Sequence, residues 1–239
     1  MTLTTLFRAW ATVLVAMLAA ILLTTAAFAT GAGAQEQPPC SGKVVLDPGH
    51  GGTDSGAVNT KYGLTEKEQT LDVAKRLKAL LQVDGCTVYM TRTFNSQTLS
   101  NNDRYTYANT TGARVLISIH MNGSTSPSTD YTTTLFGKWR KDKELANTVF
   151  SSLSTLPAAN GTGTIATRTP YSFASGVLLK SNMPAIIAET VFITNNGEGQ
   201  NYGEGELLSD PKGVRTGRLR QQEIAEALRV GIEHYLATH

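Results

Sequence analysis

The chain has 239 residues, of which 17% are charged, and its formal net charge at pH 7 is only +2. So small a charge gives no field to attract a polyanion, and the sequence holds no cluster of lysine and arginine with interleaved aromatic residues. These features exclude nucleic acid as an expected partner. The length fits one domain with a short extension.

The first 34 residues have the features of a signal peptide. Arg8 is their only charge, an apolar run from Ala11 to Leu23 follows it, and small residues with A-x-A motifs come next. An uncleaved membrane anchor is the alternative interpretation, but the apolar run is short for a spanning helix. We expect residues 1–34 to be removed, residues 35–42 to form a polar lead-in, and the exported protein to have no stable membrane anchor.

Short apolar runs and amphipathic segments alternate along the rest of the chain. The runs predict strands at Val44–Leu46, Thr87–Thr91, Val115–Ile119, Gly176–Leu179 and Ile186–Ala188. Helical spacing predicts helices over 66–82, 101–109, 141–153 and 221–236. Stretches rich in Gly, Ser, Thr or Asn predict surface loops at 123–138, 155–175 and 195–217. The alternation predicts a single compact α/β domain, with a mainly parallel or mixed sheet flanked by helices on both faces.

Two cysteines, Cys40 and Cys86, each stand just before an expected strand. If these two strands are parallel neighbours, both cysteines lie at the same end of the sheet. An exported protein meets an oxidising compartment, where disulfides persist. We therefore expect a disulfide between Cys40 and Cys86.

Two histidines come directly after expected strands. His50 lies in the turn Asp47–Gly52 after the first strand, and His120 ends the run Val115–Ile119. Either one alone fits an ordinary loop or structural histidine. Catalytic groups in open α/β sheets gather at the carboxyl ends of strands, so the pair at matching ends favours a site.

Glu66 lies on the apolar face of the first expected helix, together with Val73, Leu77 and Leu81. A buried carboxylate needs a partner, because an unpaired buried charge is very costly. A metal ion would be one. The alternative is a glutamate attracted to the helix dipole, behind Thr65 as a cap. Two histidines and one glutamate form a ligand set that catalytic zinc uses, with one position left open.

Glu189 ends the apolar run Ala185–Ala188, so it is expected at the same edge of the sheet. A zinc site that splits an amide also needs a carboxylate that is not a ligand, to transfer protons. The residues alone leave two assignments open. Either Glu189 transfers protons and Glu66 binds the metal, or the two roles are reversed.

In chain order, these segments resemble the motifs of the zinc-dependent N-acetylmuramoyl-L-alanine amidases of the third family, from Lys43 to about Leu236. The resemblance is carried by Leu46–Gly52 with Asp54 and Gly56-Ala57, by Glu66-Lys67 with Leu71 and Ala74, by Ile117–Asn122, and by Glu189 with Phe192 and Asn195. The intervening pattern is matched by Thr91-Arg92, Leu99, Arg104 and Ala108-Asn109. Val191 stands where the family usually has glycine, and we expect it to narrow the floor of the cleft.

The resemblance implies that residues 43–239 form a zinc amidase catalytic domain, in which His50, Glu66 and His120 bind Zn²⁺ and Glu189 is the catalytic carboxylate. It implies hydrolysis of the amide between N-acetylmuramic acid and L-alanine, in peptidoglycan or muropeptide fragments. Two other hypotheses are a zinc peptidase that cuts within the stem peptide and a non-catalytic module that binds wall fragments. We expect a monomer in the periplasm or cell envelope, with secretion as the alternative.

Overall fold

The structure, a computed structural model, describes residues 40, 42–203 and 220–239, which belong to one compact unit. The expected signal peptide, residues 1–34, and most of the lead-in lie outside the described residues. None of the helices described is both long enough and apolar enough to cross a membrane.

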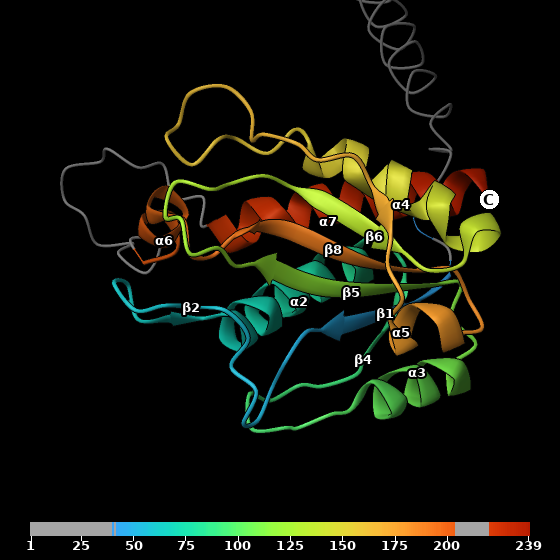
Figure 1. The fold of residues 1–239 in the computed structure, drawn as a ribbon. Helices are drawn as coiled ribbons and strands as arrows, with labels where there is room; N and C mark the ends of the chain where they lie inside the picture. Colours follow the sequence, from blue (N-terminus) through green and yellow to red (C-terminus); the bar gives the residue numbers. More distant parts are fainter. Residues whose placement is uncertain (1–39, 41, 204–219) are drawn as a thin grey trace, which may run out of the picture. The chain divides into compact units, whose positions relative to one another are not determined.

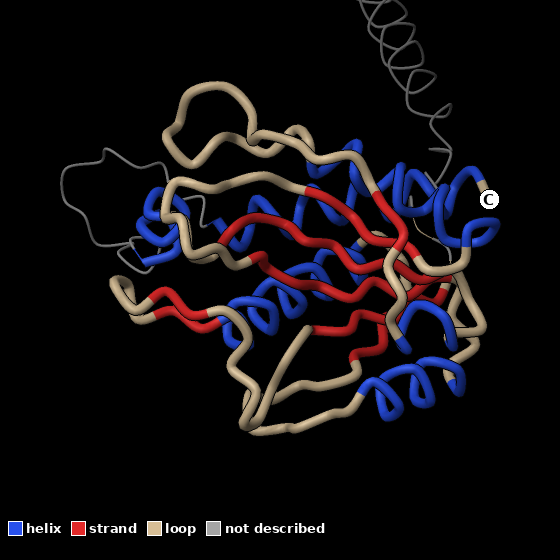
Figure 2. Tube along the Cα trace, in the orientation of Figure 1, coloured by secondary structure: helices blue, strands red, loops and turns tan. Residues whose placement is uncertain are grey.

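A six-stranded sheet forms the centre of the domain, in the order β4-β1-β5-β8-β6-β7 (Figure 2). Its strands are β1 (Lys43–Pro48), β4 (Thr87–Met90), β5 (Val115–Asn122), β6 (Thr133–Phe136), β7 (Tyr171–Ser172) and β8 (Ala185–Phe192). β4, β1, β5 and β8 are parallel, β6 is antiparallel to β8, and β7 is parallel to β6. A small hairpin pairs β2 (Val58–Asn59) with β3 (Leu64–Thr65). The predicted mainly parallel or mixed sheet is confirmed.

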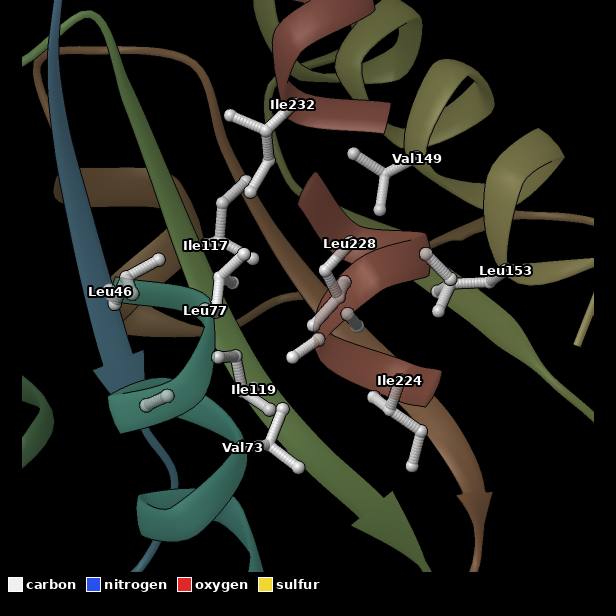
Figure 3. Close-up of a cluster of buried hydrophobic side chains, with 14 of the residues drawn as sticks. Leu46, Val73, Leu77, Ile117, Ile119, Val149, Leu153, Ile224, Leu228 and Ile232 are labelled. Carbon is white, nitrogen blue, oxygen red and sulfur yellow. The ribbon is translucent and has the colours of Figure 1, made fainter. Parts of the chain in front are cut away.

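Helices cover both faces of this sheet. They are α2 (Glu66–Val83), α3 (Asn101–Thr110), α4 (Trp139–Leu153), α5 (Gly176–Lys180), α6 (Asn196–Gly203) and α7 (Arg220–Thr238). The larger core lies between the sheet and α2, α4 and α7, where Leu77, Ile117 and Leu228 are fully buried (Figure 3). A smaller core on the other face joins Leu116 and Ile187 to Ala108 of α3 and Leu178 of α5.

The parallel strands direct their carboxyl ends to one edge of the sheet. In Figure 1 the arrowheads of β1 and β5 point toward the end where β2 and α6 lie. Helix α2 begins at this edge directly after β3, so its first residue, Glu66, is placed beside the ends of β1 and β5. The topology therefore gathers the candidate residues at one place, as the sequence predicts.

The predicted strand at Gly176–Leu179 and the predicted loop at 123–138 are wrong. Gly176–Leu179 was expected to be a strand, but it forms α5, because a run of four apolar residues fits one helical turn as well as a buried strand. The expected loop 123–138 contains β6, whose threonines are buried in the sheet. Thr134 satisfies its hydroxyl by donating to the Ala146 carbonyl at 2.9 Å, which lets a polar residue occupy the interior.

Smaller elements also interrupt the other expected loops. The stretch 155–175 contains β7, and 195–217 contains α6. Val191 is fully buried in the larger core. It therefore packs into the core and does not line a cleft, contrary to the expectation that it narrows a cleft floor.

Cys40 and Cys86 form a disulfide, with their Cα atoms 5.2 Å apart. β1 and β4 are parallel neighbours, with Lys43 opposite Thr87, so the two cysteines lie at the amino end of this strand pair as expected. Both are buried, and the bridge ties the segment before β1 to the turn that follows α2.

The bridge closes a loop of 46 residues, and such a constraint on the unfolded chain stabilises by roughly 2–4 kcal/mol. We expect the double variant Cys40→Ala/Cys86→Ala to lose about that much free energy of unfolding in urea. Reductant should destabilise the wild type to a similar extent and leave the double variant unchanged. Equal unfolding free energies for the oxidised wild type and the variant would contradict a stabilising role.

Candidate functional site

His50 lies in the turn after β1 with a φ of 60°, in the left-handed region. Few residues other than glycine adopt this conformation, which costs about 1–3 kcal/mol and persists only where the surrounding structure imposes it. The turn packs tightly, since a Cβ on Gly49 would lie 2.5 Å from Nε2 of His120. Glycine at this position lets the His120 imidazole approach the backbone of the turn.

Two buried arginines hold this turn. Arg104 donates hydrogen bonds to the carbonyl oxygens of Pro48 and His50, both at 2.8 Å. Arg92 donates to the carbonyl oxygens of Pro48 at 3.0 Å and Gly49 at 2.8 Å. Every carbonyl from Pro48 to His50 therefore accepts a hydrogen bond from a fixed guanidinium, which stabilises the strained conformation.

Asp47, at the end of β1, supplies the opposite charge. Its carboxylate accepts hydrogen bonds from Arg104 at 2.7 Å, Thr91 at 2.6 Å and Ser118 at 2.7 Å. Burial, together with the charge of Arg104, lowers the pKa of Arg92 to about 10, so that guanidinium stays charged at neutral pH. Both arginines match the family pattern in the sequence, but their role in holding this turn was not predicted. A signal was available, because Arg92 directly follows a predicted strand.

Glu66 lies at the centre of the site and is only 4% exposed. Its Oε2 accepts a hydrogen bond from the Ala57 amide at 2.8 Å, and its Oε1 accepts one from the Met121 amide at 2.9 Å. The same Oε1 lies 2.9 Å from His50 Nε2 and 3.0 Å from His120 Nδ1. Backbone groups thus fix the carboxylate while both imidazoles converge on one of its oxygens.

These contacts determine the protonation of the site. Burial alone would raise the pKa of Glu66, but the hydrogen bonds from His120 and His50 outweigh it and lower the pKa to about 2. Burial lowers the pKa of each histidine, but contact with Glu66, together with the charge of Asp54 on His50 and of Glu189 on His120, more than offsets this, so both pKa values are raised. The carboxylate is therefore ionised at neutral pH, with both imidazoles turned toward it.

Asp54 lies on the other side of His50. Its Oδ2 is 2.8 Å from His50 Nδ1, and its Oδ1 accepts a hydrogen bond from the Gly56 amide at 3.0 Å. A carboxylate on one imidazole nitrogen orients the ring and fixes its tautomer, which leaves the opposite nitrogen free to bind a metal. Asp54 therefore directs His50 Nε2 toward Glu66.

The arrangement fits a metal ion. The ligand atoms offered by His50, Glu66 and His120 all lie within 4.8 Å of one another. Two imidazole nitrogens and one carboxylate oxygen match the donors that zinc uses at catalytic sites. The structure thus brings the three predicted ligands together. His50 comes from the turn after β1, Glu66 from the start of α2, and His120 from β5.

Glu189 lies next to this cluster on β8, directly opposite His120 of β5 in the parallel register. Neighbouring strands are about 5 Å apart, so Glu189 borders the cluster without sharing its hydrogen bonds. Burial raises the pKa of Glu189, the charges of His120 and His50 lower it, and Glu66 raises it. The net effect is a raised pKa, which favours a carboxyl group that can both accept and release a proton.

Comparison with known proteins agrees with this geometry. Residues 44–210 match the family described as Amidase_3, N-acetylmuramoyl-L-alanine amidase. N-acetylmuramoyl-L-alanine amidase LytC of Bacillus subtilis is 34% identical over 180 residues, which cover 73% of this chain and 34% of LytC. Probable cell wall amidase LytH of Staphylococcus aureus is 34% identical over 164 residues, covering 67% of this chain and 52% of LytH. The chain therefore spans between a third and about half the length of these curated relatives.

Solved structures show the same fold. An N-acetylmuramoyl-L-alanine amidase from Clostridium difficile 630 superimposes with a TM-score of 0.67 at 31% identity, covering 82% of this chain and 97% of that one. The catalytic domain of CwlV from Bacillus (Paenibacillus) polymyxa var. colistinus gives 0.67 at 26% identity, covering 83% and 100%. This α/β domain, with its histidine–glutamate cluster at the carboxyl ends of the strands, has the architecture of a cell-wall amidase catalytic domain. The chain belongs to the N-acetylmuramoyl-L-alanine amidase family Amidase_3.

Arg104 provides a test of the support beneath His50. Removing one partner of a buried ion pair leaves an uncompensated charge, so we expect Arg104→Ala to lower the free energy of unfolding by roughly 3–5 kcal/mol. Arg140→Ala, which removes an exposed arginine of α4, should change it by no more than about 0.5 kcal/mol. Urea unfolding of both variants measures the difference. A loss for Arg104→Ala as small as that of the control would contradict its proposed support of the turn.

Proposed function

We propose that this chain is a zinc-dependent hydrolase that cleaves the amide between N-acetylmuramic acid and L-alanine in peptidoglycan or muropeptide fragments. The observation that carries the proposal is the convergence of His50, Glu66 and His120 within 4.8 Å, with Glu189 on the adjacent strand, in a domain of this family. We assign the three clustered residues as metal ligands and Glu189 as the catalytic carboxylate. A bound zinc ion would polarise the amide carbonyl and lower the pKa of a water molecule.

Hydrogen bonding supports this division of roles between the two glutamates. Glu66 has both oxygens engaged by backbone amides and faces both imidazoles, so it is fixed in place and ionised. Glu189 lies outside that set of contacts, and its pKa is raised, first by burial. In our proposal Glu189 takes a proton from the attacking water and delivers it to the amide nitrogen as the peptide leaves.

Positioning is the task of the surrounding residues. Asp54 orients His50, and the guanidinium groups of Arg92 and Arg104 hold the turn that carries it. Their bonds are already made without substrate, so little reorganisation is needed when the reaction begins. We propose that these residues determine how firmly the metal is held and that Glu189 determines the rate of proton transfer.

We also propose that the protein works outside the cytoplasm, after residues 1–34 are removed as a signal peptide, and that residues 43–239 act as a monomeric catalytic domain. The disulfide between Cys40 and Cys86 supports export, because disulfides persist in oxidising compartments. The relatives LytC and LytH bear the names of an N-acetylmuramoyl-L-alanine amidase and a probable cell wall amidase, which agrees with action on the cell wall.

Incubation of a purified muropeptide with the protein tests the proposal by mass analysis. We expect release of a free stem peptide that begins at L-alanine, its loss after zinc chelation and its recovery when zinc is restored. Glu189→Gln should slow release at least about 100-fold, because it removes the proton acceptor, while leaving the zinc content unchanged. Glu68→Gln, at an exposed glutamate in the first turn of α2, is the matched control and should retain wild-type activity.

Other outcomes identify the competing hypotheses. Products cut within the stem peptide would retain the zinc chemistry but assign a peptidase. Binding of the intact fragment without cleavage by the wild type would favour a non-catalytic module and contradict the proposed hydrolase. Undiminished activity of Glu189→Gln would show that another group transfers the proton.

A further inference from the structure

A positively charged aromatic cluster lies around the starts of β6 and β7, two strand positions from Glu189 of β8. It consists of Arg168, Tyr131 and Tyr171, which we name the Arg168 cluster. Arg168 Nη1 donates a hydrogen bond to the Tyr131 hydroxyl at 3.3 Å, and its guanidinium carbon lies 4.7 Å from the centre of the Tyr171 ring. The two tyrosines therefore fix the direction of an exposed cation.

The register of the strands places this cluster near the catalytic carboxylate. Thr133 of β6 pairs directly with Glu189 of β8. The neighbouring residue Thr132 bridges to Thr167 and accepts a hydrogen bond from the Arg168 amide at 3.0 Å. Glu189 and the backbone of Arg168 are thus two strand spacings apart, or about 10 Å.

Tyr171 of this cluster and Glu189 also share one face of the sheet. Tyr171 pairs with Leu135, which pairs with Ile187, and alternate residues of a strand lie on the same face, so Glu189 shares the face of Ile187. Burial raises the pKa of Tyr171, the charge of Arg168 lowers it, and the charge of Glu189 raises it further. Tyr171 therefore lies within electrostatic range of both charged groups.

Arg168 differs from the buried arginines in its partners. Arg104 pairs with Asp47, and Arg220 pairs with Glu198, each within the protein. Within the described part of the chain Arg168 forms no ion pair with a carboxylate; its side chain hydrogen-bonds to Tyr131 and lies over the ring of Tyr171. A guanidinium held in this way presents its remaining N–H donors for a planar anion such as a carboxylate.

The two sides of the scissile amide differ in charge, which identifies the group that Arg168 would bind. N-acetylated sugars on the glycan side carry no charge, whereas the stem peptide carries free carboxylates beyond its first residue. The backbone separation of about 10 Å between Glu189 and Arg168 corresponds to roughly three extended residues. We infer that Arg168 determines specificity by binding a free carboxylate of the stem peptide, two or three residues beyond the bond that is cut. This inference rests on the proposed amidase function.

A pair of matched substrates tests this inference. The first is a muramoyl tripeptide whose second and third residues carry free carboxylates, and the second is the same compound with these carboxylates converted to carboxamides. We expect Arg168→Ala to lower kcat/KM for the carboxylate form by about 10- to 100-fold, mainly through KM, and to change the carboxamide form less than about 2-fold. Arg168→Lys should recover part of the loss, and the exposed control Arg140→Ala should change neither substrate.

The outcomes separate this inference from the proposed function. If the wild type cleaves both substrates and Arg168→Ala affects them equally, or affects neither, the amidase stands and the carboxylate contact is wrong. If the wild type releases stem peptide from neither substrate, the proposed function fails and the inference falls with it. A thermal melting curve for each variant checks that the exposed substitutions leave the fold intact.

Discussion

The burial of one carboxylate, that of Glu66, constrains the whole carboxyl-terminal edge of the sheet. A buried ionised group without partners is strongly unfavourable. The fold supplies the Ala57 and Met121 amides and the imidazoles of His50 and His120. These donors come from segments far apart in the sequence, so α2 must begin where the ends of β1 and β5 meet. A Cβ on Gly56 would lie 2.5 Å from Glu66 Oε2, which shows how closely the chain surrounds the carboxylate.

Positive charge is used in two different ways around this centre. Arg92 and Arg104 are buried and hydrogen-bond to backbone carbonyls, and Arg104 also pairs with Asp47. They therefore act on the site only by holding the turn that carries His50. Arg168 is exposed and its guanidinium stacks on Tyr171, so that guanidinium is accessible to a ligand. Rigid support lies beneath the site, and the proposed substrate contact lies beside it, on the loop that precedes β7. Loops carried by a rigid sheet commonly supply specificity in this way.

Much of the site could be predicted because periodicity reports which face a residue occupies. The spacing of Val73, Leu77 and Glu66 predicts the buried carboxylate, and the apolar runs predict that His120 and Glu189 come at strand ends. The structure extends both strands past these residues and pairs them directly. Periodicity gives no distances, so it could not decide which of Glu66 and Glu189 is the proposed metal ligand and which the proposed proton carrier. The proposed assignment rests on their hydrogen bonds, because backbone amides fix only Glu66. Short segments failed for a related reason: four apolar residues at 176–179 fit either a helix or a strand, and the buried threonines of β6 resemble a polar loop. The Arg168 cluster depends on long-range strand pairing, which no local pattern predicts.

Anomalous scattering from crystals of the zinc-loaded protein, collected on both sides of the zinc edge, would identify the residues that bind the metal ion. We expect one strong zinc position per chain, with His50 Nε2, Glu66 Oε1 and His120 Nδ1 as its protein ligands at about 2.0–2.2 Å. Glu189 should lie nearby without ligating the ion. A zinc ion bound by Glu189 in place of Glu66, or zinc found only at surface positions, would contradict the assignment.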